Sequence, residues 1–176
     1  LIKAARDESE ILEKTFKAIK TTPEIGKLTR TALVILIEKI GLKEVMASRH
    51  ITPIQKTKLL TAAELNEDEK LTIFDDLLKE SDNLSGQLDE DSFRRLIEFA
   101  VTEKNGEAFK TVMERFSNSP EVINKMSRAT RKLFFEQLHF RGEDEIFEIF
   151  KEALTQQAQQ YLWEDLSGKV KDRIGM

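Results

Sequence analysis

Few residues of this chain belong to the types that carry out chemistry, and their spacing argues against a catalytic site. The two histidines, His50 and His139, are far apart in the sequence, and neither has a second histidine at a metal-binding spacing. No side chain near either one has the pattern of a nucleophile. The chain has no cysteine, which excludes thiol chemistry and a disulfide framework. We therefore expect a protein that is not an enzyme and holds no cofactor and no metal, with both histidines in structural roles.

Two acidic triplets have the right chemistry for general acids or metal ligands. They are Glu67-Asp68-Glu69 and Glu143-Asp144-Glu145. Each stands where we expect the first turn of a helix, and the helix dipole stabilises negative charge there by about 0.3–1 kcal/mol. Because this role explains both triplets, we interpret them as structural.

The segment from Ser81 to Ser92 resembles a calcium-binding loop of the helix–loop–helix type. With Gly86 at the sharp turn, oxygen ligands fall at Ser81, Asn83 and Ser85. Calcium takes about six to eight oxygens, usually including several carboxylates and a bidentate glutamate at the last position of the loop. Here serines stand at the first and last positions, so two anchors are missing. We interpret the segment as a polar loop between helices; the weaker alternative is a cation site, which would make the domain calcium-responsive.

The composition is that of an ordinary globular protein. Hydrophobic residues make up 40% of the chain and charged residues 34%, and 32 acidic against 28 basic residues leave a net charge of −4. Neither sign forms a long run, so no basic or acidic tail points to nucleic acid. The longest purely apolar run, from Ala32 to Ile37, is far shorter than the roughly 20 residues that cross a bilayer. We expect an intracellular protein without a membrane segment.

The three prolines indicate a helical chain. Each follows a hydroxyl residue, in Thr22-Pro23, Thr52-Pro53 and Ser119-Pro120. A hydroxyl at the N-cap accepts a hydrogen bond from a free backbone N–H, and proline at the next position has no N–H to leave unpaired. All three pairs therefore predict helix starts. Thr52–Gln55 and Asn66–Glu69 have the spacing of capping boxes, while Gly106 and Gly142 suit the left-handed residue that ends a helix.

Between these positions apolar residues recur at spacings of three and four, which is typical of amphipathic helices. The pattern predicts helices at 6–20, 23–40, 53–65, 67–80, 90–104, 106–116, 120–126, 127–140, 143–157 and 159–173, with a short helical turn around 43–48. No stretch alternates for long enough to form a strand. We predict an all-α protein, arranged as an α-solenoid of antiparallel helix pairs, with a compact multi-helix bundle as the alternative.

The predicted helices recur as pairs. Leu59-Leu60, Leu96-Ile97 and Leu133-Phe134 are spaced 37 residues apart, which indicates a two-helix unit that buries its apolar face by stacking. We interpret residues 1–176 as a single helical domain, with atypical N-terminal helices in 1–50, three helical-hairpin repeats in 53–157 and a C-terminal capping helix in 158–176. Six residues on the apolar faces should be buried, namely Leu96, Ile97, Phe109, Val112, Leu133 and Phe150.

The second of these repeats resembles a pentatricopeptide-type hairpin. It reads Ser92-Phe93-Arg94-Arg95-Leu96-Ile97, then Asn105-Gly106-Glu107-Ala108-Phe109, then Val112-Met113 and Phe116. The third repeat is similar, and tetratricopeptide repeats share these features. The resemblance implies binding of RNA or a peptide along a concave surface, and it suggests a mitochondrial as well as a cytoplasmic location. On the first helix, where that family usually has Asn, Thr or Ser, this chain has Arg94-Arg95 and Arg131-Lys132.

These cations are the candidate partner-binding residues: Arg94, Arg95, Arg131 and Lys132. The 37-residue spacing predicts that they lie at equivalent points of neighbouring repeats and converge on one surface, which we call the basic stripe. Such a stripe could bind phosphate or an acidic peptide, although Glu98 and Glu136 are close enough in sequence to neutralise part of it. We predict a non-catalytic binding or scaffold module that acts through protein–protein interaction. The alternative is an RNA-binding module of pentatricopeptide type for organellar RNA, and no sequence feature determines the oligomeric state.

Overall fold

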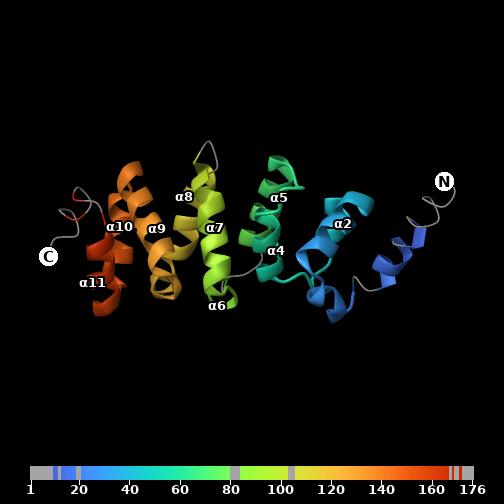
Figure 1. Ribbon diagram of the computed structural model, residues 1–176, viewed down its shortest axis with the longest axis horizontal. Helices are drawn as coiled ribbons and strands as arrows, with labels where there is room; N and C mark the ends of the chain where they lie inside the picture. The colour runs from blue at the N-terminus through green and yellow to red at the C-terminus, as the bar shows by residue number, and fades with distance from the viewer. Residues whose placement is uncertain are drawn as a thin grey trace. The chain divides into compact units, whose positions relative to one another are not determined.

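The computed structural model describes residues 10–11, 13–18, 21–79, 84–102, 106–166, 168 and 171. These residues form helices and turns, and no strand occurs among them, which confirms the predicted all-α class (Figure 1). The chain divides into two compact units, Leu1–Asp82 and Asn83–Met176. The boundary falls inside the segment interpreted as three repeats. The solenoid arrangement and the single domain stay predictions.

The first unit is built from α-helices with a 3-10 helix near its start. Its elements are helical residues 10–11 and 13–18, the 3-10 helix η1 (Pro23–Lys27), α2 (Arg30–Ile40), α3 (Leu42–Met46), α4 (Pro53–Leu60) and α5 (Glu67–Lys79). Helix α2 packs against α3 and α4, and α4 packs against α5. Fully buried side chains from α2, α3, α4 and α5 contribute to the core of this unit, at Leu33, Val45, Leu59 and Ile73.

The second unit has a similar succession of elements. They are α6 (Leu84–Gln87), α7 (Glu90–Thr102), α8 (Glu107–Ser117), the 3-10 helix η2 (Pro120–Lys125), α9 (Arg128–Arg141), α10 (Asp144–Glu152) and α11 (Gln156–Asp165). Helix α9 packs against α7, α10 and α11, and α8 packs against both α7 and α10. The core is rich in phenylalanine, with buried rings at Phe93, Phe109, Phe116, Phe134, Phe135, Phe147 and Phe150.

Side-chain caps position the starts of these helices. The predicted capping boxes are confirmed, since Thr52 and Gln55 bond reciprocally, as do Asn66 and Glu69. The prediction that helix 23–40 runs continuously from Pro23 is wrong, because the chain first forms η1 and then starts α2 at a second cap, Thr29, whose hydroxyl accepts from the N–H of Ala32.

The second unit repeats this arrangement: Pro120 opens a 3-10 helix and Ser127 caps α9. As expected, Gly142 ends α9 in a left-handed conformation with φ 74°. Its N–H donates to the carbonyl of His139 and the next N–H donates to that of Leu138, which is the Schellman arrangement.

Buried side chains lie at a fixed number of residues after the N-cap of each helix. Side chains cap the helices α2, α4, α7, α9 and α11 at Thr29, Thr52, Asp89, Ser127 and Thr155. The side chain seven residues after each cap is buried, at Leu36, Leu59, Leu96, Phe134 and Leu162. The side chain four residues after the cap is also buried in α2, α4, α7 and α9, at Leu33, Lys56, Phe93 and Arg131.

This count corrects one predicted core residue. Leu133 lies one position before the core position that Phe134 occupies, and its side chain is only half-buried. The prediction that Leu133 is buried is therefore wrong. The other five predicted core residues are buried, at Leu96, Ile97, Phe109, Val112 and Phe150.

Candidate functional site

Arg131 does not belong to an exposed basic stripe. Its side chain is buried, with 7% of the residue surface exposed. Its Nε donates to the carbonyl of Ile123 at 3.2 Å and its Nη2 donates to that of Met126 at 2.9 Å, at the end of η2. Burial lowers the pKa of the Arg131 guanidinium. Arg131 lies four residues after the cap Ser127, as Phe93 lies four residues after the cap Asp89, so these two positions are equivalent. The prediction that Arg131 lies level with Arg94 and Arg95 is therefore wrong.

Gln55 has the corresponding role in the first unit. Its Nε2 donates to the carbonyls of Ile25 and Leu28 at 3.1 and 2.9 Å, at the end of η1. In both units a buried polar side chain thus donates to two carbonyls at the end of a 3-10 helix. The role of Arg131 is structural.

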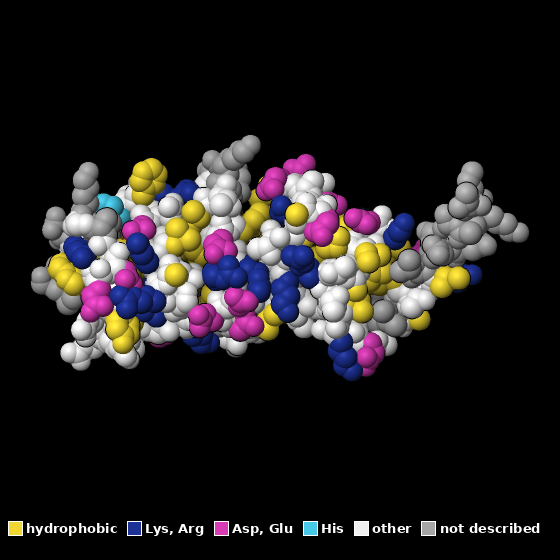
Figure 2. Space-filling view, viewed as in Figure 1, with side chains coloured by type: hydrophobic (Ala, Val, Ile, Leu, Met, Phe, Trp, Pro, Cys, Tyr) yellow, Lys and Arg dark blue, Asp and Glu magenta, His cyan; other side chains and the backbone are white. Residues whose placement is uncertain are grey.

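The remaining three predicted cations lie beside acidic side chains. Arg94 bonds Asp91 at 3.1 Å and Glu98 at 3.0 Å, and these hydrogen bonds raise its pKa. Arg95 also pairs with Asp91, and the Nζ of Lys132 lies 4.0 Å from Glu136. Over α7, Figure 2 shows basic and acidic side chains directly beside one another. Acidic neighbours therefore reduce the positive field of these cations, and their role in binding a partner stays a prediction.

Part of the calcium-like segment lies outside the described residues, including Ser81 and Asn83. The structure places Gly86 within the short helix α6, where a calcium loop would have its sharp turn. The Oδ1 of Asp89 accepts from the N–H of Ser92 at 2.8 Å and so caps α7. Within the described ranges, no group of three or more His, Asp or Glu side chains is placed to hold a metal ion.

The histidines are placed in turns and helix ends. The Nε2 of His50 lies 3.0 Å from the carbonyl of Thr21 and joins the turn before η1 to the loop before α4. His139 stands in the last turn of α9, where its carbonyl accepts from Gly142.

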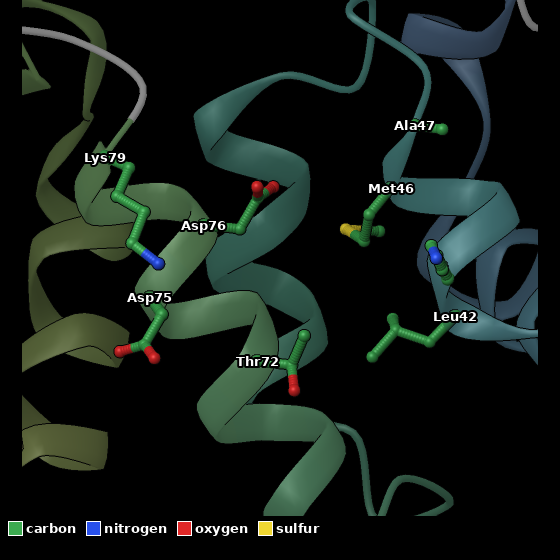
Figure 3. Close-up of a pocket in the computed structure, with 8 residues that line it drawn as sticks. Leu42, Met46, Ala47, Thr72, Asp75, Asp76 and Lys79 are labelled. Atoms are coloured by element: carbon green, nitrogen blue, oxygen red, sulfur yellow. The ribbon is translucent and has the colours of Figure 1, made fainter.

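A groove of about 630 Å³ lies in the first unit between α3 and α5. One wall is apolar and consists of Leu42, Met46 and Ala47, of which Leu42 and Met46 point toward α5 (Figure 3). The facing wall is polar and consists of Thr72, Asp75, Asp76 and Lys79, and Lys43 completes the lining. The sequence predicted only a short helical turn around 43–48, and the groove itself was not foreseen. We call it the α3–α5 groove.

A buried ion pair holds the polar wall of this groove. Lys56, in α4, is fully buried, and its Nζ lies 2.7 Å from Oδ2 of Asp76, whose side chain is 39% exposed. Loss of the Asp76 carboxylate would remove an acidic partner from the buried Lys56 ammonium and should weaken the contact between α4 and α5. The ion pair therefore fixes α5 against α4, while Oδ1 of Asp76 accepts no hydrogen bond within the described part of the chain.

Comparisons of the chain with protein-family models, with curated protein sequences and with solved structures find no match. Within the described residues, no helix combines the length and the apolar character needed to span a bilayer. The function must therefore be argued from the geometry of this chain.

Proposed function

We propose that this protein is a non-catalytic module of helical repeats that binds another protein. The observation that carries the proposal is the α3–α5 groove. Its apolar wall is half-exposed at Leu42 and Met46, and the surface of a partner can bury these side chains. Methionine suits such a surface because its flexible thioether adapts to different partners.

The repeat part of this proposal is supported by the caps. Thr52, Asp89 and Ser127 follow one another at intervals of 37 and 38 residues, and core side chains lie at the same count after each. Each of these caps begins the first helix of a packed pair, in α4–α5, α7–α8 and α9–α10. Gln55 and Arg131 add the same polar contact to a preceding 3-10 helix.

RNA has less support as a partner. Binding to the phosphate backbone requires cations that can exchange their counterions for phosphate. Of the four predicted cations, Arg131 is buried, Arg94 and Arg95 are paired with Asp91, and Lys132 lies near Glu136. A phosphate would have to displace these intramolecular carboxylates.

Two measurements test the proposal. The purified chain is used as bait in a cell extract with and without nuclease, and it is separately passed over immobilised single-stranded RNA at increasing salt. A protein that is retained after nuclease treatment and binds the chain directly once purified is the expected result. Retention on RNA that falls steeply with salt, together with loss of protein capture after nuclease, would overturn the proposal in favour of RNA.

A further inference from the structure

We draw no further inference here: the strongest candidate, the outer face of α10 around the exposed side chain of Ile149, is an apolar patch flanked by Glu145 and Glu152, and nothing in the structure shows what covers it.

Discussion

Replacing Phe134 with alanine should destabilise the second unit far more than replacing its neighbour Leu133. Phe134 is fully buried, and its ring lies 4.9 Å from that of Phe150, 5.7 Å from that of Phe109 and 6.1 Å from that of Phe135. A phenylalanine-to-alanine change in a core costs about 3–5 kcal/mol, and the loss of these ring contacts, each worth about 0.5–1.5 kcal/mol, places Phe134 toward the upper end. Leu133 is half-buried, so its truncation leaves no closed cavity and should cost about 1 kcal/mol.

Urea unfolding followed by the fluorescence of Trp163 measures this difference, because the only tryptophan of the chain lies in α11 of the same unit. With a slope of about 2 kcal/mol per molar urea, Phe134→Ala should lower the midpoint by roughly 2 M and Leu133→Ala by about 0.5 M. Equal shifts for the two variants would refute the rule that the residue seven positions after the N-cap lies in the core. They would favour the alignment of Leu133 with Leu96.

Three further outcomes follow from local contacts. Gly106→Ala should cost more than Gly142→Ala in urea unfolding: both glycines have φ 74°, but a Cβ at Gly106 would meet Nη1 of Arg141 at 2.1 Å. The additional loss of stability in Gly106→Ala should be about 0.5–1 kcal/mol, because the Arg141 guanidinium no longer stacks on the Phe109 ring. This additional loss should vanish when Arg141 is also replaced by alanine. The hydrogen bond from Arg128 lowers the pKa of Asp165, so the pair stabilises the fold above the ordinary aspartate pKa of 3.8 and loses this effect as the pH falls through the lowered value. Asp165→Asn should therefore lower the melting temperature at neutral pH, and its difference from the wild type should shrink as the pH falls through the lowered pKa. Millimolar calcium should leave the melting temperature unchanged, and a rise of several degrees would show that the folded chain binds the ion.

Local chemistry determined much of the secondary structure. A capping box or a Schellman turn joins residues only three to five positions apart, so Thr52–Gln55, Asn66–Glu69 and Gly142 predicted helix boundaries that the structure confirms. The all-α class follows in the same way, because the spacing of apolar residues within one helix does not depend on what the helix packs against.

The predictions for Arg131 and Leu133 were wrong for the same reason, which lies in tertiary packing. Aligning Leu133-Phe134 with Leu96-Ile97 by residue type was one position wrong, and that shift placed Arg131 on the surface and Leu133 in the core. The tertiary structure shows what an arginine does at this core position: its guanidinium donates to the carbonyls of Ile123 and Met126 at the end of η2. A count from Ser127 would have placed Phe134 correctly, since a cap fixes the phase of its helix.

The sequence by itself therefore determined the helical class, most helix starts and most of the core, because those properties depend on residues close together in the chain. The tertiary structure alone decided which charges are accessible. It pairs Lys56 with Asp76 across 20 residues and opens the α3–α5 groove between segments about 30 residues apart. A groove exists only through the relative lengths and packing of helices that are separate in sequence, and no local pattern encodes that relation.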